Sequence, residues 1–342
     1  MNRLTRTCPP LSLHVFFLQA DMKKSISFII SIAGIVGLII FLHYYTLPQE
    51  GLRPDVIGKI AAKSISEVSG MAKSAGYENT YWVVNDSRNG TRLFAVNREG
   101  NTIIPTFSRF SYYGEEKVEG KELWPGFRVL YAENIDWASM TIDESYLYIA
   151  DTGNNFNNRR DLGIYLISEI DPTASTQSAA IRFIPVHYPE QEEFPGLGER
   201  HYDSEALFLF EDSLYLITKH RDQSGSFEPG ANLYRLDSND EDASNALTLI
   251  ENHPKMMAVT GAELSPDGSM LAVISYNDLW IFDRPEQGDH WLSSSHRRYP
   301  LDTLYVGQVE TIIWDDDSTL VISNEQRTLY VVDLAVLGEI TP

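Results

Sequence analysis

Cysteine and positive charge are both scarce in this chain. Cys8 is the only cysteine among 342 residues, which excludes an intramolecular disulfide scaffold. The 27 Lys and Arg residues are outnumbered by 48 Asp and Glu residues, which gives a formal net charge of -21. Binding to a phosphate backbone needs a basic surface, so we expect no nucleic-acid partner. The rest of the composition, 43% hydrophobic and 22% charged, is typical of a globular protein with a large core.

The best-known catalytic motifs are missing as well. The sequence contains no G-x-S-x-G, H-E-x-x-H, Walker A or G-x-G-x-x-G pattern, which removes the usual signals of serine hydrolases, zinc proteases and nucleotide-binding enzymes. His201 and His220 are the candidates for proton transfer, because imidazole titrates near neutral pH. Lys219 precedes His220 and is the other catalytic candidate. For each histidine the alternative is an ordinary packing or surface role.

One long uncharged apolar segment is present, at residues 25–45. About 20 such residues can cross the ~30 Å hydrocarbon layer as a helix. Lys23 and Lys24 precede the segment, so we expect residues 1–24 to be a cytoplasmic stub. A cleaved signal peptide is the alternative, although the following HYYTLPQE offers no small-residue cleavage site. The sequence therefore predicts a single-pass signal anchor in a bacterial inner membrane, with a periplasmic C-terminal domain.

The residues around this anchor add two expectations. Met22 begins MKKSISFII, which is typical of a complete bacterial amino terminus, so a start at Met22 would remove residues 1–21 and with them Cys8. Beyond residue 44 the chain holds 23 basic and 47 acidic residues. The acid excess therefore belongs to the domain that is expected outside the cytoplasm.

Five similar segments follow from about residue 64. Each has an acid entering a short strand, a polar turn, a second apolar strand and then a third. Their second strands read TYWVVNDS, YLYIADTGNN, SLYLITKH, MLAVISYND and TLVISNE, and turns such as PDGS and DDDS bound the strands. Periods of 47 to 69 residues, with about four strands each, predict an all-β fold, a β-propeller of five blades. Six blades and a β-sandwich are the alternatives.

The propeller is expected to occupy residues 64–342, after a linker at 46–63. Within and just after the linker, DVIGKIAAKSIS is predicted to supply an outer strand to the last blade and so to close the ring. The outer strands of the other blades are predicted at TIIPTFSRF, AAIRFIPVHY, ALTLIEN and RRYPLDTLYV.

A family resemblance is carried by SGMA…YWVVNDSRNGTRLFAVNREG, ENIDWASMTID…LYIADTGNN, HYDSEALFL…LYLITK and VTGAELSPDGSMLAVISY. Over most of residues 64–330 the chain resembles a group of bacterial membrane-anchored β-propeller proteins of unassigned activity, with segments such as NDSG, ENVDWEDIA, GDIGNN and DAEAL. Ala138, Ser139 and Arg88 depart from that pattern. The group is loosely similar to esterase-like phytase and gluconolactonase-like propellers. The resemblance implies the fold, which enzymes and binding proteins share, and implies no reaction.

One acid occupies a similar place in each of the five segments: Glu67, Asp136, Glu205, Glu263 and Glu310. The first strands of a propeller line its central channel, so these carboxylates are expected to converge there. Converging carboxylates cannot all stay ionised without a cation, and hard oxygen ligands suit calcium or magnesium. The five acids are therefore candidate metal ligands, with calcium as the expected ion. The alternative is structural, with acids that cap backbone amides or pair with arginine between blades.

A second group of polar residues ends the second strands. The candidates for channel or ligand binding among them are Asn85, Asp86, Asp151, Asn154 and Glu325. Ordinary turn formation is the alternative for each. A rigid ring with varied loops and no catalytic motif predicts a binding module for a small-molecule or protein ligand. The competing hypothesis is a divalent-metal-dependent hydrolase of phosphoesters or lactones, in which the acids hold the metal and His220 or Lys219 assists.

Overall fold

Short strands joined by tight turns make up most of the described chain. The computed structural model describes residues 51–86, 90–196, 198 and 200–338. Its elements are almost all strands, so the all-β prediction is confirmed. The predicted anchor at 25–45 lies outside the described residues. Within them, no helix is long and apolar enough to span a bilayer.

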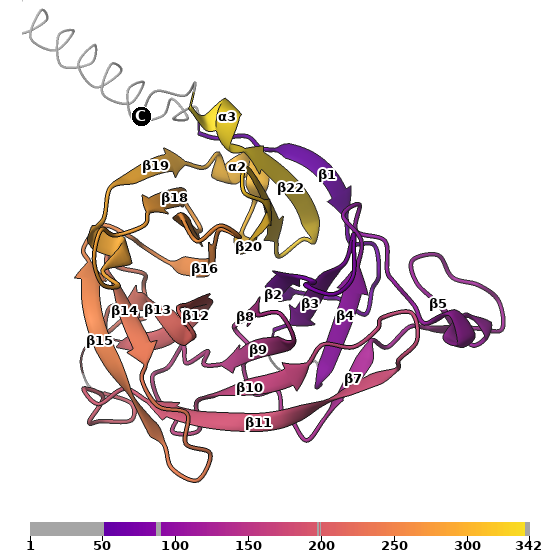
Figure 1. Cartoon of the computed structure of the whole chain (residues 1–342), viewed down its shortest axis with the longest axis horizontal. Coiled ribbons are helices and arrows are strands. Elements are labelled where there is room, and N and C mark those ends of the chain that lie inside the picture. Colours follow the sequence, from indigo (N-terminus) through magenta and orange to yellow (C-terminus); the bar gives the residue numbers. More distant parts are fainter. Residues whose placement is uncertain (1–50, 87–89, 197, 199, 339–342) are drawn as a thin grey trace, which may run out of the picture. The chain divides into compact units, whose positions relative to one another are not determined.

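The strands form five sets around a common centre (Figure 1). The first strand of each set lies innermost, and these strands are β2 (Val68–Lys73), β8 (Ser139–Ile142), β12 (Arg200–Phe210), β16 (Val259–Leu264) and β20 (Val309–Asp316). Each first strand contacts the first strand of the next set, and β20 contacts β2. The five first strands therefore form a closed ring around the central channel.

Each set continues outward through antiparallel pairs. The second strands are β3 (Tyr81–Asn85), β9 (Tyr146–Asp151), β13 (Ser213–Arg221), β17 (Met270–Ser275) and β21 (Thr319–Asn324). The third strands are β4 (Arg92–Val96), β10 (Gly163–Ser168), β14 (Ala231–Leu236), β18 (Asp278–Asp283) and β22 (Thr328–Asp333). The outer strands are β7 (Phe127–Leu130), β11 (Gln177–His187), β15 (Asn245–His253), β19 (His296–Pro300) and, from the N-terminal side, β1 (Asp55–Lys59).

The N-terminal strand closes the last set. β1 pairs antiparallel with β22, from Asp55 opposite Val331 to Lys59 opposite Thr328. Residues that precede the first set in the chain thus cover the outer edge of the fifth (Figure 1). This pairing is the closure that the sequence predicts, and it leaves β22 without a free edge.

Two predicted outer strands are wrong in part. In the first set, TIIPTFSRF does not form the outer strand: residues Thr106–Phe110 are a 3-10 helix (η1) that begins after Pro105, whose ring lacks the N–H that a strand needs. The outer strand of that set is β7, which pairs with β4. In the sequence between η1 and β7, β5 (Tyr112–Tyr113) pairs in parallel with β6 (Glu122–Leu123).

RRYPLDTLYV divides into β19 and the short helix α2 (Thr303–Val306), because the Asp302 carboxylate accepts hydrogen bonds from two backbone amides of that helix. The remaining elements are η2 (Trp291–Ser293) and α3 (Leu334–Leu337).

The core consists of apolar layers between neighbouring sets. One layer joins the first and second sets through Trp82, Phe127 and Trp137. Another joins the third and fourth sets, and there Phe208 and Trp280 are buried. The second and third, fourth and fifth, and fifth and first sets pack in the same way. Strands buried on both faces need apolar side chains on both, which explains runs such as YWVV and LAVI.

Candidate functional site

A cavity of about 190 Å³ lies where the first strands begin and the second strands end. We call it the acidic cavity. Its lining includes six carboxylates and two cations, namely Glu67, Asp86, Asp136, Glu205, Glu310 and Glu325 with Lys219 and Arg221. Tyr276, Gln308 and Asn155 add neutral polar groups. Four of the five acids that the sequence aligned therefore meet at one place.

These four acids reach the cavity from two kinds of position. The strand register shifts at Glu205 in β12 and at Glu310 in β20, as at a β-bulge, which re-aims the extra residue. Glu67 and Asp136 instead lie in the segments just before β2 and β8. The five aligned acids therefore do not occupy equivalent positions in their strands. The register shifts of β2 and β16 fall at Ser69 and Thr260, and not at the aligned acids of those segments.

Glu263 lies apart from the other four acids. It follows the register shift of β16 by three residues and lines a second cavity of about 390 Å³, together with Lys73 and Trp314. Burial raises the pKa of Glu263 to about 8, although the Trp314 backbone and the charge of Lys73 act in the opposite direction. The ring of five acids predicted from the sequence is therefore a group of four acids and one separate carboxyl.

A buried ion pair organises the acidic cavity. The Lys219 ammonium lies 2.8 Å from Glu205 Oε1, and the side chains are only 4% and 13% exposed. Burial raises the pKa of Glu205 to about 7, with Asp203 adding to the rise and Lys219 opposing it. Burial alone would lower the pKa of Lys219, but the carboxylates of Glu205 and Asp203 raise it above its usual value. Lys219 is therefore a fixed positive charge and not a proton carrier near neutral pH.

Asp136 lies close to other carboxylates. Burial raises its pKa to about 8, and the nearby carboxylates of Glu205 and Asp86 contribute to the rise. A Cβ at Gly153 would lie 2.3 Å from the Asp136 carboxyl carbon, so the glycine leaves the room that this carboxyl occupies. Two carboxyls that share a low-dielectric space cannot both ionise easily, which makes Asp136 a proton-holding group at neutral pH.

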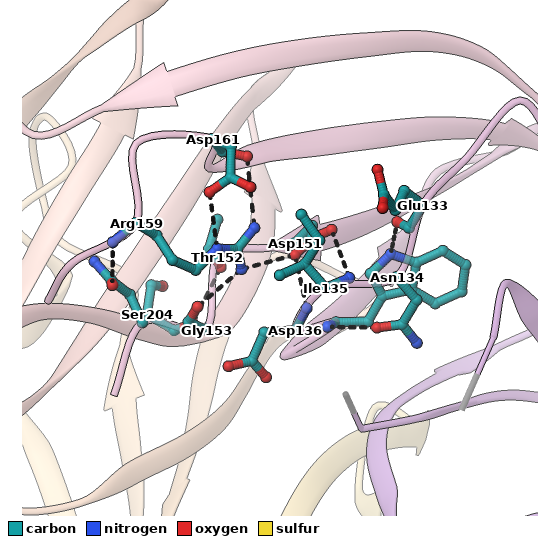
Figure 2. Close-up of polar contacts among 12 residues, drawn as sticks. Glu133, Asn134, Ile135, Asp136, Asp151, Thr152, Gly153, Arg159, Asp161 and Ser204 are labelled. Carbon is teal, nitrogen blue, oxygen red and sulfur yellow. Dashed lines mark hydrogen bonds and ion pairs between the residues drawn. The ribbon is translucent and has the colours of Figure 1, made fainter. Parts of the chain in front are cut away.

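Asp151 holds the backbone that carries Asp136 (Figure 2). Its carboxylate accepts hydrogen bonds from the amides of Ile135 at 3.3 Å and Asp136 at 2.9 Å, and it pairs with Arg159 at 2.8 Å. Asp151 is buried and does not line the cavity. Its role in this structure is to position the loop before β8.

Glu310 faces the same space from the fifth set. Burial raises its pKa to about 8, while a hydrogen bond from Gln308 and the charge of Lys219 lower it. The Gln308 amide nitrogen lies 2.5 Å from Glu310 Oε1 and 3.1 Å from the Tyr276 hydroxyl. Gln308 thus connects an acid of the fifth set to a tyrosine of the fourth.

The residues that end the second strands divide into two groups. Asp86 and Glu325 line the acidic cavity. The other candidates serve the backbone: the Asn85 amide bonds to Ser64 and Ser66, and that of Asn154 to Tyr202 and Arg159. For Asn85 and Asn154 the turn-forming alternative therefore describes the observed contacts.

The two candidate histidines lie on the other side of β13 from Lys219. His220 is 3% exposed, and its ring stacks on that of His201 with centroids 3.8 Å apart. Burial and, to a smaller extent, the charge of His201 lower the pKa of His220 to about 3. Nε2 of His201 lies 2.5 Å from the Glu228 carboxylate. Neither histidine lines the acidic cavity. His220 has the contacts of a packed residue, whereas His201 lines a separate cavity of about 290 Å³ together with Gln191 and Tyr202.

Three residues of this region were missed by sequence reasoning. Arg221 and Gln308 line the cavity, and the fully buried Asp203 lies beneath it, with Oδ2 3.9 Å from the Arg221 Nε. Side-chain alternation along β13 was a usable signal for Arg221, because residues two apart in a strand share a face and Lys219 was already a candidate. The contribution of Gln308 to the cavity depends on its hydrogen bond with Tyr276 of another set. No local sequence pattern encodes such a contact.

Metal binding by the aligned acids stays a prediction. Among the residues that the structure describes, no group of three or more His, Cys, Asp or Glu side chains is arranged to hold a metal ion. Glu263 is separated from the other acids, and Glu205 already pairs with Lys219.

No known family model and no curated protein sequence matches the chain. Among solved structures, the chain is similar to the PQQ-bound aldose sugar dehydrogenase of Streptomyces coelicolor, with a TM-score of 0.45 and 9% identity over 82% of this chain and 98% of that one. It is also similar to a gluconolactonase of Xanthomonas campestris, with a TM-score of 0.39 and 10% identity over 84% and 96%. Similarities this low transfer no activity and no ligand to the chain.

Proposed function

We propose that this chain is a membrane-anchored, five-bladed β-propeller that binds a small cationic ligand in its acidic cavity. The five sets of strands and the closed ring of first strands support the blade count. The anchor and the periplasmic location rest on the apolar segment 25–45 and the two lysines before it. A binding module needs a preformed polar cavity on a rigid frame, and the acidic cavity meets that description.

The observation that carries this proposal is the unequal charge of the acidic cavity. Among the described residues, six carboxylates face two cations, and one of these cations, Lys219, is already paired with Glu205. Burial raises the pKa of both Asp136 and Glu310 to about 8, so these groups hold protons where a ligand cation would let them ionise. A positively charged ligand is therefore attracted to two carboxyl groups whose ionised forms are unfavourable in its absence.

The size and lining of the cavity favour an organic ammonium group over a bare metal ion. A volume of about 190 Å³ accepts a short alkylammonium chain. Tyr276 contributes an aromatic wall, and its ring already accepts a cation, the Lys219 ammonium, 5.6 Å from the centroid. The ligand class proposed here is accordingly a short, polar amine or diamine.

Isothermal titration calorimetry with 1,4-diaminobutane tests this proposal, with calcium chloride and sodium phosphate titrated in parallel. We expect saturable binding of the diamine at pH 8 and no binding of phosphate. Glu310→Gln and Asp136→Asn should each weaken diamine binding, because each removes one carboxyl of the cavity. Glu211→Gln, which alters an exposed pair with Arg284, is the control and should bind like the wild type. Equal heats from all variants, or none from the wild type, would refute cation binding in this cavity.

A hydrolase is the second candidate function. It is favoured by one observation, the pKa of about 8 of Asp136 beside Asp86, since a carboxyl that holds its proton near neutral pH can serve as a general acid. A panel of phosphoester and lactone substrates, assayed with calcium and with EDTA, tests it. Turnover that disappears in Asp136→Asn would establish the enzyme, whereas rates equal to the buffer background would exclude it for these substrates.

A further inference from the structure

The second cavity lies at the opposite end of the first strands from the acidic cavity. All five first strands or the turns after them contribute to its lining, through Ser74, Thr141, Leu209, Glu263 and Trp314 among others. Its volume is about 390 Å³, and apolar side chains make up most of the wall: Ala75, Ile142, Leu209, Leu264, Pro266 and Trp314. We call it the Glu263 cavity. Cavities of this size and composition, with a few polar groups, are typical of small-molecule sites.

Most polar side chains of this lining are engaged elsewhere. The Lys73 ammonium donates to the backbone carbonyl of Asp315 and lies 3.6 Å from its carboxylate. The Ser74 hydroxyl donates to Glu169, and the Ser265 hydroxyl donates to Asp267 at 2.7 Å. Glu263 is therefore the charged group of the wall that remains for a ligand.

We propose that the Glu263 cavity binds a small organic ammonium compound with an apolar body, the ammonium at Glu263 and the body against Leu209, Leu264 and Trp314. An ammonium group gives the buried carboxyl a charged hydrogen-bond donor, and the Trp314 ring adds attraction for a cation. Burial raises the pKa of Glu263 to about 8, so a bound cation would restore its charge. An anionic ligand would face Glu263 while Lys73 is held by Asp315.

This site is separate from the acidic cavity. The space between the two is about 10 Å³, and its walls include Gly70, Gly261 and Thr311. Such a space holds about one water molecule at most. The two cavities are therefore distinct spaces with different linings. The proposal does not rest on cation binding at the acidic cavity.

Tryptophan fluorescence distinguishes the two cavities. Trp314 lines the Glu263 cavity, whereas no tryptophan is among the residues that line the acidic cavity. Titration with benzylammonium chloride should change the emission saturably. Benzyl alcohol, which has the same body without the charge, should bind at least about tenfold more weakly, and sodium benzoate should not bind.

Three variants complete the test. Glu263→Gln should weaken benzylammonium binding about tenfold and leave benzyl alcohol unchanged, because only the charge is removed. Ala75→Phe, at an exposed position on the wall, should abolish both by filling the cavity, and it covers the case in which Glu263→Gln misfolds. Asp283→Asn, which alters an exposed pair with Arg297 and lines neither cavity, is the control and should change neither. The proposal is wrong if benzoate binds as tightly as benzylammonium, if Glu263→Gln binds benzylammonium like the wild type, or if no saturable change occurs.

Discussion

The two ends of the central channel are built from the same five strands and differ in chemistry. At the beginning of these strands, six carboxylates and two cations of the described part of the chain surround about 190 Å³. At their far end, six apolar side chains and the Glu263 carboxyl line a cavity of about 390 Å³. Every repeat contributes an acid near its first strand, yet the position along the strand decides which cavity the acid reaches. A shift of three residues along β16 is enough to move Glu263 from one end to the other.

Ion pairs at the two ends differ in the same way. Lys219 and Glu205 form their pair with side chains 4% and 13% exposed, whereas Lys73 and Asp315 are 42% and 19% exposed. Breaking a buried pair leaves an uncompensated charge, while an exposed pair is screened by water. The acidic end should therefore depend on its lysine far more than the apolar end does.

Replacement of Lys219 should give the largest effect. Lys219→Met leaves Glu205 beside Asp203 without a counter-charge, and we expect a loss of about 3 kcal/mol in the free energy of unfolding. Lys73→Met is the matched control and should cost less than about 1 kcal/mol. Urea denaturation at pH 7 measures both. Equal losses would mean that burial does not distinguish the two ends.

The pH dependence of stability should be the next largest effect. In the folded protein Glu263 has a pKa of about 8, against 4.5 for an ordinary glutamate, so it keeps a proton that the unfolded chain has lost. Folding then takes up protons between pH 4.5 and 8, and the free energy of unfolding falls as the pH rises through this window. Glu263→Gln removes this contribution, so from pH 5 to pH 8 the variant should gain about 3 kcal/mol relative to the wild type.

Denaturation curves at several pH values measure this difference. Glu310→Gln should behave alike, because burial also raises the pKa of Glu310 to about 8. Parallel pH profiles of the wild type and both variants would show that the pKa of neither carboxyl is raised in the folded protein.

A methyl group at Gly153 should have a smaller effect, confined to the acidic end. In Gly153→Ala the new Cβ would meet the Asp136 carboxyl carbon at 2.3 Å, so the carboxyl must move. We expect a loss of about 1–2 kcal/mol and weaker diamine binding, with benzylammonium binding unchanged. Gly196→Ala, whose nearest neighbour would lie 4.0 Å away, is the control. Thermal unfolding and the two ligand titrations provide the readouts.

The smallest effect is expected at Glu67. This residue is exposed at the edge of the acidic cavity. Glu67→Gln should change the free energy of unfolding by less than about 0.5 kcal/mol, because its charge is solvated. A loss comparable to that of Lys219→Met would show that Glu67, at the exposed edge of the cavity, contributes as much to stability as the buried pair.

Much of the strand pattern was predictable from the sequence. Short apolar runs between polar turns identified the first three strands of every set, since strands packed on both faces need such runs. The outer strand of the first set was not predictable in this way. The segment TIIPTFSRF suggested it, but Pro105 interrupts that segment, and β7 pairs with β4 instead.

The sequence indicated which types of residue form the candidate site better than it indicated which individual residues do. Lys219, Asp86 and Glu325 were singled out and line the acidic cavity. His220 was singled out beside Lys219, although successive side chains of a strand face opposite ways, and its contacts are those of a packed residue. Glu263 was aligned with four acids that it does not join, because it lies three residues beyond the register shift of β16 and so farther along its strand than they do.

The sequence by itself determined the all-β class, the repeated order of strands, the N-terminal closing strand and the excess of acids near the first strands. Each of these depends on local propensity or on periodicity within one segment. The tertiary structure decided which acids share a cavity, which of them Lys219 neutralises and which one stands alone at the apolar end. Those outcomes depend on strand register and on distances between sets, and an interaction between charges falls with a separation that no single segment specifies.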